Sequence, residues 1–291
     1  MQTNNVPLPK VPGYDILRVV STEGASAIVY WGIDKRSGFP VAVKRLLKSS
    51  AKSEFLLNRF RITSDIQLTL SSHHNRLVRM IDFVEYDGEY YLMMEFVEGA
   101  DLDKYQRQKS GPIPEERAIP MFLKILDAID YMHKARFPGN NQRRGVLHLD
   151  IKPNNIKVLE NDEVKVLDLG LSAFIDDLRG RCVSLGGTPQ FMPPEQADGG
   201  YMAPYTDIFA LGTTLFFMLS ARYAFELNTA YEHIKAGKIP RIKNYYPFVK
   251  PEIQDILDKA MNPDYTKRYQ SCSEFTNDLV NLYNINLKSI L

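Results

Sequence analysis

The sequence predicts an α+β fold in two parts, a small strand-rich part followed by a larger helical part. Up to residue 96, short apolar runs rich in β-branched residues alternate with turn residues, as is typical of strands. After residue 97, apolar residues recur at helical spacing. With 291 residues and a hydrophobic content of 44%, the chain can bury a substantial core.

The first part begins with residues 1–12, which carry three prolines and are expected to form a loose N-terminal arm. Residues 13–96 follow, with strands expected at 16–20, 28–31, 40–44, 77–86 and 90–96 and a helix over 52–71. Asp87-Gly88 separates the last two strands and is a strong hairpin signal.

The second part, residues 97–291, is predicted to be mainly helical. Helices are expected over 101–108, 115–134, 205–220, 226–236, 251–261 and 273–283. The most apolar run, Ile208 to Leu219, is shorter than the roughly 20 residues that span a bilayer, which favours a buried helix and no membrane contact.

The composition excludes several classes of function. A net charge of +1 argues against nucleic-acid or membrane binding as the main activity. Cys182 and Cys272 are too few for a disulfide framework or a cysteine metal cluster, which favours a reducing, cytoplasmic location. The N-terminus lacks the basic-then-apolar layout of a signal peptide.

One stretch carries a recognisable chemistry. His148-Leu149-Asp150-Ile151-Lys152-Pro153-Asn154-Asn155 is followed, after a short hairpin pattern, by Asp168-Leu169-Gly170. Phosphoryl transfer from a Mg-nucleotide needs a carboxylate for the attacking hydroxyl, a cation for the phosphate and oxygen ligands for the metal. The two motifs have the order and spacing of a kinase catalytic loop and metal-binding motif.

On these motifs the chain resembles the eukaryotic-like (Hanks-type) serine/threonine protein kinase family, with bacterial character, over nearly its whole length. The resemblance implies a two-lobed kinase fold, with residues 13–96 as the N-lobe and 97–291 as the C-lobe. It also implies ATP and Mg²⁺ as cofactors and a protein as substrate.

The resemblance assigns roles to the catalytic residues. Asp150 would accept the hydrogen bond of the substrate hydroxyl and act as base, and Lys152 would balance charge on the transferred group. Asn155 and Asp168 would bind Mg²⁺ through oxygen atoms. The position of Lys152, together with Gly187-Thr188-Pro189, favours serine or threonine over tyrosine.

Lys44, at the end of Val41-Ala42-Val43-Lys44, resembles the lysine that contacts the nucleotide phosphates. Its acidic partner is open between Asp65, at the family's position on the regulatory helix, and Glu54, about three turns earlier. Thr22, Gly24 and Ala27 stand where three glycines are expected. Such a loop is either a less snug phosphate cover or an ordinary hairpin that has lost its grip on nucleotide.

The adenosine site is placed by resemblance alone. Val29 and Ala42 would cover the adenine ring, and Met94 would limit access to a back pocket. The backbones of Glu95 and Val97 would hydrogen-bond adenine, and Asp101 would contact the ribose. Lys157 lies where an apolar residue usually forms the floor of the site, which its aliphatic stem can do.

Further motifs resemble the activation segment and its supports. Glu195 would pair with Arg268, and Asp207 would anchor the backbone of the catalytic loop. Leu149 replaces the usual arginine before the catalytic aspartate and so removes the cation that receives a phosphorylated activation segment. Residues 136–145 look like an insertion, either a solvated loop or a docking site for an acidic partner.

The sequence therefore predicts an ATP- and Mg²⁺-dependent serine/threonine protein kinase. Two other functions stay open. A pseudokinase, acting as a nucleotide-binding scaffold or regulatory module, would account for the eroded glycine loop and for aspartate at position 65. A kinase of a small metabolite would share the catalytic loop, although it would not need the activation-segment motifs. The oligomeric state is not predicted.

Overall fold

The computed structural model describes residues 6–22, 27–47, 53–109, 111–137, 143–178 and 187–291. It divides into two compact units, Met1–Glu98 and Gly99–Leu291, and the α+β class expected from the sequence is confirmed. The division falls two residues after the sequence-based boundary at 96/97. Each unit is described by itself.

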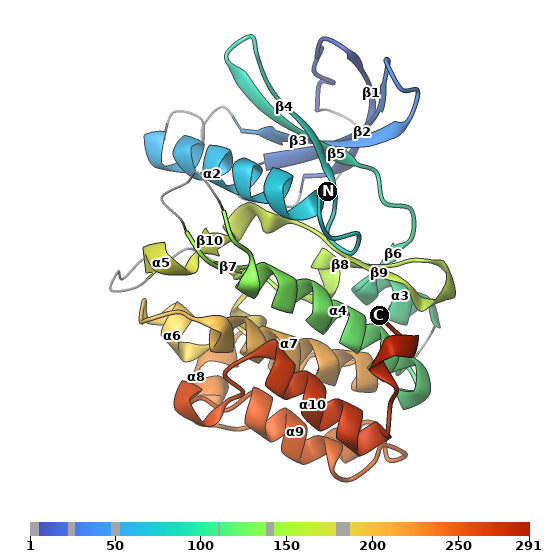
Figure 1. Cartoon of the computed structure of the whole chain (residues 1–291), viewed down its shortest axis with the longest axis vertical. Coiled ribbons are helices and arrows are strands. Elements are labelled where there is room, and N and C mark those ends of the chain that lie inside the picture. Colours follow the sequence, from blue (N-terminus) through green and yellow to red (C-terminus); the bar gives the residue numbers. More distant parts are fainter. Residues whose placement is uncertain (1–5, 23–26, 48–52, 110, 138–142, 179–186) are drawn as a thin grey trace. The chain divides into compact units, whose positions relative to one another are not determined.

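The first unit is a five-stranded antiparallel sheet with one helix (Figure 1). Its strands, in spatial order β1-β2-β3-β5-β4, are β1 (Tyr14–Ser21), β2 (Ala27–Asp34), β3 (Pro40–Leu46), β5 (Glu89–Glu95) and β4 (Met80–Tyr86). The helix is α2 (Glu54–Ser71), and Ser53 caps it by accepting a hydrogen bond from the Leu56 amide. The β4–β5 hairpin turns at Asp87-Gly88, as the sequence predicts.

Strand alternation gives this sheet two different faces. On one face Tyr30, Val41, Val43, Tyr91 and Met93 form a buried apolar cluster. The N-terminal segment closes the same cluster, since Val11 is buried and bridges to Tyr14 while Val6 packs alongside. The described part of residues 1–12 is thus attached to the sheet, in contrast to the loose arm expected from its prolines.

The opposite face of the sheet is covered by α2. Phe60 of the helix packs against Phe83 of β4, with ring centroids 5.8 Å apart. Phe83 is paired with Leu92 of β5, which is paired in turn with Lys44 of β3. Because directly paired residues point to the same face, Lys44 lies on the face that α2 covers.

The second unit is built around helices that the sequence predicts closely: α3 (Leu102–Lys109), α4 (Glu115–Lys134), α7 (Pro204–Ser220), α8 (Ala230–Lys235), α9 (Ile253–Ala260) and α10 (Cys272–Tyr283). Every residue of α7 from Thr206 to Ser220 is buried, which explains why its sequence is apolar on all sides. Helices α4, α9 and α10 present one apolar face each to this core.

Several short elements complete this unit. The hairpin expected between the two motifs is present as β8 (Ile156–Val158) and β9 (Val164–Val166). The sequence did not reveal β6 (Ala100–Asp101), which pairs with β8, or the pair of β7 (Val146–Leu147) with β10 (Ala173–Phe174). Two single-turn helices, α5 (Ile175–Leu178) and α6 (Pro194–Ala197), follow. Elements of two to four residues carry too little periodicity to be recognised in a sequence.

Candidate active site

The predicted catalytic loop, residues 148–155, runs from β7 to β8 and is fixed from below by Asp207. One carboxylate oxygen of Asp207 accepts the His148 amide and the other accepts the Leu149 amide, both at 2.8 Å. His133 of α4 contacts the same carboxylate at 2.8 Å through Nε2. Leu149 can therefore be held in a left-handed conformation, with φ of 65°, that few non-glycine residues adopt.

The anchoring carboxylate is charged although it is fully buried. Burial by itself would raise the pKa of Asp207, but the hydrogen bond with His133, the electrostatic interactions with His133 and His148 and the backbone bond from His148 outweigh it and lower the pKa below its usual value. The sequence indicated Asp207 but not His133, because a single histidine on an amphipathic helix carries no signal of its partner.

Asp150 lies at the centre of a compact polar cluster. Its carboxylate is 2.8 Å from the Lys152 ammonium and accepts hydrogen bonds from Thr188, at 3.2 Å, and from the Asn155 amide, at 3.0 Å. Lys152 also donates to the Thr188 hydroxyl at 2.9 Å. The structure thus brings Asp150, Lys152 and Asn155 together, and it adds Thr188 as the link to the activation segment.

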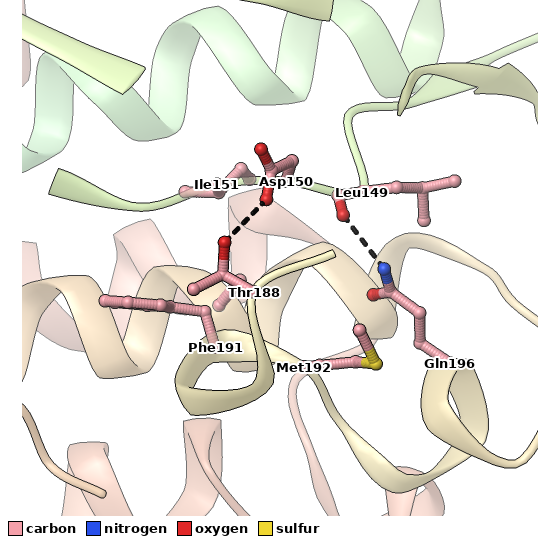
Figure 2. A pocket seen from close by; sticks show the side chains of 8 residues that line it. Leu149, Asp150, Ile151, Thr188, Phe191, Met192 and Gln196 are labelled. Carbon is pink, nitrogen blue, oxygen red and sulfur yellow. Dashed lines mark hydrogen bonds between the residues drawn. The ribbon is translucent and has the colours of Figure 1, made fainter. Parts of the chain in front are cut away.

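A small pocket lies directly beneath this cluster (Figure 2). It is lined by Leu149, Asp150, Ile151, Thr188, Phe191, Met192, Gln196 and Ala210. Figure 2 shows two hydrogen bonds between lining residues, from the Thr188 hydroxyl to the Asp150 carboxylate and from the Gln196 side chain to the Leu149 carbonyl, the second at 2.9 Å. The segment around Thr188 and the catalytic loop are therefore held as one assembly.

Asn155 and Asp168 stand at the same end of the β8–β9 hairpin. Asn155 directly precedes β8, and its carbonyl accepts the amide of Leu167, which precedes Asp168, at 2.8 Å. The Asn155 amide group donates to Asp150, which leaves its Oδ1 without a hydrogen bond among the described residues. Asp168 is exposed and adopts φ 54° and ψ 74°. An amide oxygen and a carboxylate fit a hard cation such as Mg²⁺.

The end of the activation segment is fixed by a buried ion pair. Nη1 and Nη2 of Arg268 donate to the Glu195 carboxylate, at 2.6 and 3.0 Å, and Arg268 also donates to the carbonyls of Tyr205 and Pro263. Both side chains are almost fully buried, so their charges depend on each other. The pairing predicted from the two surrounding motifs is present.

Leu149 occupies an apolar site. It is 3% exposed and clusters with Leu147, Leu178 and Met202, against which Leu171, Ala173 and Ile175 also pack. Four members of this cluster belong to residues 171–178, which follow the predicted metal-binding motif at 168–170. Where an arginine would offer a charge, Leu149 instead buries apolar surface of the activation segment.

In the first unit, four predicted nucleotide-site residues share one face of the sheet. Val29 is paired with Lys44 and Ala42 with Met94, and Ala42 and Lys44 are two residues apart on β3. This is the face that α2 covers. Glu95 follows at the end of β5, where its amide donates to the Arg79 carbonyl at 2.9 Å, and Val97 lies just beyond.

The expected acidic partners of Lys44 lie elsewhere. Glu54 and Asp65 are the only acidic residues of α2, and both are exposed. The Asp65 carboxylate makes no hydrogen bond or ion pair within the described residues. The buried face of the helix carries Thr63, Ser64 and Gln67 instead. The sequence position suggested Asp65, but the rotation of the helix turns that side chain to solvent.

Asp101, the predicted ribose contact, is engaged in an ion-pair network of the second unit. Its carboxylate is 3.0 Å from Lys157 and 2.9 Å from Lys104. Burial raises the pKa of Asp101, but the two lysines more than offset this and lower it.

Gly24 lies outside the described residues. Thr22 is exposed, while Ala27 is buried as the first residue of β2.

A strand-rich unit followed by a helical unit, an anchored aspartate–lysine–asparagine loop and a buried Glu195–Arg268 pair together define the class of protein. The protein kinase domain family matches residues 20–279, and the chain belongs to this family.

Bacterial serine/threonine-protein kinases are among its relatives. The chain is 32% identical to serine/threonine-protein kinase PrkC of Bacillus subtilis and 31% identical to probable serine/threonine-protein kinase CPE1738 of Clostridium perfringens, in each case over 91% of this chain. It is 27% identical over 93% of this chain to serine/threonine-protein kinase PknB of Mycolicibacterium smegmatis. It spans only 38% to 43% of the length of these three relatives.

Proposed function

We propose that this domain transfers the γ-phosphate of ATP to a serine or threonine hydroxyl of a protein substrate, with Mg²⁺ as cofactor. The observation that supports this most directly is the cluster of Asp150, Lys152, Asn155 and Thr188, linked by contacts of 2.8 to 3.2 Å. The relatives are called serine/threonine-protein kinases, and the family's reaction uses ATP and Mg²⁺.

In this proposal Asp150 orients the substrate hydroxyl and takes its proton late in the transfer. Lys152, 2.8 Å from Asp150, neutralises charge on the transferred group. Thr188 contacts both and so ties the protein-substrate platform to the reacting atoms. Mg²⁺, when bound, would neutralise phosphate charge, and the oxygens of Asn155 and Asp168 would hold it.

For nucleotide binding, we assign Lys44 to the phosphates and Val29, Ala42 and Met94 to the adenine, since the sheet register gathers them on one face. Glu95 and Val97 would contact adenine through their backbones, and Gly24 would belong to the phosphate loop. Asp101 would contact the ribose either alongside its ion pairs with Lys157 and Lys104 or in exchange for one of them.

A pseudokinase is the second candidate, and one observation favours it. Helix α2 presents no carboxylate on its buried face, whereas active kinases pair the phosphate-contacting lysine with a glutamate of that helix. Such a protein would bind nucleotide and transfer no phosphate.

The test uses radiolabelled ATP with Mg²⁺ and compares wild type, Asp150→Asn and Asp168→Asn on a generic protein substrate and on the domain itself. We expect the wild-type domain to transfer phosphate and both variants to lose this activity. Nucleotide affinity, measured by titration, should be nearly unchanged in Asp150→Asn and weakened in Asp168→Asn. Transfer by Asp150→Asn at the wild-type rate would refute the catalytic assignment. A wild-type domain that binds nucleotide but transfers no phosphate would favour the pseudokinase.

The remaining assignments concern the setting of the domain. We place it in the cytoplasm, because two cysteines, Cys182 and Cys272, are too few for a disulfide framework, as suits a reducing compartment. No helix among the described residues combines the length and apolarity needed to cross a membrane. We propose a protein substrate and no nucleic-acid partner, consistent with the net charge of +1.

A further inference from the structure

Residues 136–145, which look from the sequence like an exposed loop, begin and end in ordered contacts at the C-terminus of α4. Arg136 forms a bridge with Arg144, and the Phe137 amide donates to the Arg143 carbonyl at 3.2 Å. The Gly145 amide donates to the Ala135 carbonyl at 2.8 Å. The described ends of the insertion therefore form a small closed ladder, and Phe137 is buried.

The side chains of this ladder reach the beginning of the activation segment. Phe137 packs edge-on against Phe174, with ring centroids 4.9 Å apart and planes at 89°. The Arg143 guanidinium lies over the Phe174 ring, 4.7 Å from its centroid, and contacts Asp177 at 3.2 Å. One arginine thus joins the two ends of residues 174–177.

Backbone contacts support the same attachment. The Arg144 amide donates to the Asp176 carboxylate at 3.2 Å, and the Ile175 amide donates to the Gly145 carbonyl at 3.1 Å. A Cβ atom on Gly145 would lie 2.5 Å from the Ile175 side chain and 2.6 Å from the His133 carbonyl oxygen, so a larger residue would crowd this contact. The adjoining β7–β10 pair sets the register of Phe174 opposite Val146 (Figure 1).

These contacts converge on one short segment from several directions. A partly exposed ion pair and a cation–π contact are individually weak. They act here on residues already held by strand pairing and by the apolar cluster around Leu149. Because residues 174–177 are already ordered, each of these contacts costs little additional conformational entropy. The net stabilisation from each contact is therefore larger than it would be on a flexible segment.

We propose that the described ends of this insertion, residues 136–137 and 143–145, are a built-in clamp that positions residues 173–178 of the activation segment, with Arg143 as its positioning residue. This inference rests on the proposed kinase function, since the clamp would order the platform for the protein substrate. It supplies from within the chain the kind of attachment that a phosphate and an arginine before Asp150 could otherwise provide.

The test compares Arg143→Glu with Arg136→Glu. The second variant makes the same charge change on the same insertion, but Arg136 joins the ladder through its backbone, and its exposed side chain makes no hydrogen bond, ion pair or ring contact among the described residues. The first readout is amide hydrogen exchange over residues 171–178, which needs no catalytic activity. We expect Arg143→Glu to accelerate exchange there and Arg136→Glu to leave it unchanged.

The second readout is kinetic. Arg143→Glu should lower kcat/KM for a protein substrate roughly fivefold, as suits the loss of one cation–π contact and one ion pair, and should leave the KM for ATP within about twofold of wild type. Adding Asp177→Arg to Arg143→Glu should restore much of the exchange protection and rate, because it reverses the ion pair. A merely structural defect would not be rescued in this way.

Unchanged exchange in Arg143→Glu, or an equal effect of Arg136→Glu, would overturn the clamp. So would the absence of any rescue by Asp177→Arg. If wild type transfers no phosphate, the proposed function fails, but the exchange measurements still decide whether the clamp exists.

Discussion

Leu149 shows how a single residue can change the way in which the activation segment is held. It directly precedes Asp150, the proposed catalytic residue, and its backbone is held in the left-handed region by the Asp207 and Gln196 hydrogen bonds. Its side chain, 3% exposed, joins an apolar cluster with residues 171–178. The position before Asp150, where an arginine would bind a phosphate, therefore contributes apolar packing in this protein.

Substituting Leu149 by arginine should therefore harm the protein. The guanidinium would enter an apolar site without a buried carboxylate partner, which we expect to lower the free energy of unfolding by about 3 kcal/mol. The rate of transfer should fall with it. Leu149→Met, which keeps volume and polarity, should cost less than about 1.5 kcal/mol. Urea unfolding and steady-state kinetics would measure both, and an active, stable Leu149→Arg would mean that the site can admit a charge.

Asp65 illustrates the limit of reading a role from sequence position. Its carboxylate is exposed and makes no hydrogen bond or ion pair among the described residues, so Asp65→Ala should change transfer by less than about twofold and stability by less than about 0.5 kcal/mol. Lys44→Met is the contrasting variant and should nearly abolish transfer. A loss in Asp65→Ala comparable to that in Lys44→Met would show that the two side chains pair during the reaction.

At the scale of elements, the buried helix α7 supports the catalytic loop through a single side chain. Asp207, in the first turn of α7, accepts both loop amides and contacts His133 of α4. Three elements therefore meet at one carboxylate, and the position of Asp150 depends on it.

Asp207→Asn should weaken this junction. The asparagine amide would face a backbone or histidine donor, and we expect a loss of about 3 kcal/mol of stability together with a lower kcat. Because the folded-state pKa of Asp207 is lowered, its stabilisation is present above the unfolded-state pKa and is lost as the pH falls through the folded-state value.

The stability difference between wild type and Asp207→Asn should therefore be constant above about pH 5 and should narrow below about pH 4. Thermal denaturation at several pH values would measure it. Asp15→Asn is a suitable control, since Asp15 is 56% exposed in a surface pair with Lys35 and should change little. A difference that widens toward acid pH would contradict a lowered pKa.

At the scale of the whole molecule, the sequence predicted what periodicity and motif spacing encode. The long helices, the antiparallel hairpin at Asp87-Gly88 and the Asp150–Asn155 loop were found because each has a repeating or fixed spacing. The rotation of α2 that exposes Asp65 was not found, since it depends on packing of Phe60 against Phe83. Nor were the contacts of Arg143, because they join segments separated by the catalytic loop.

The same contacts bear on how activity would be controlled. Between Asp168 and Glu195 the hydroxyl side chains are Ser172, Ser184 and Thr188. Ser172 is buried beside the His148 carbonyl, and Thr188 is bonded to Asp150 and Lys152. Ser184 lies outside the described residues and is the remaining candidate for phosphorylation.

A phosphate on Ser184 would gain most from an arginine beside Asp150, and Leu149 supplies none. The activation segment is instead fastened by the apolar cluster, by Arg143 and by the Glu195–Arg268 pair, none of which requires a phosphate. Ser184→Ala and phosphatase-treated wild type should therefore keep most of the untreated rate, as measured by initial velocities on a protein substrate. A loss beyond about tenfold, equivalent to roughly 1.4 kcal/mol of transition-state stabilisation, would mean that another cation binds the phosphate and takes over the role of the missing arginine.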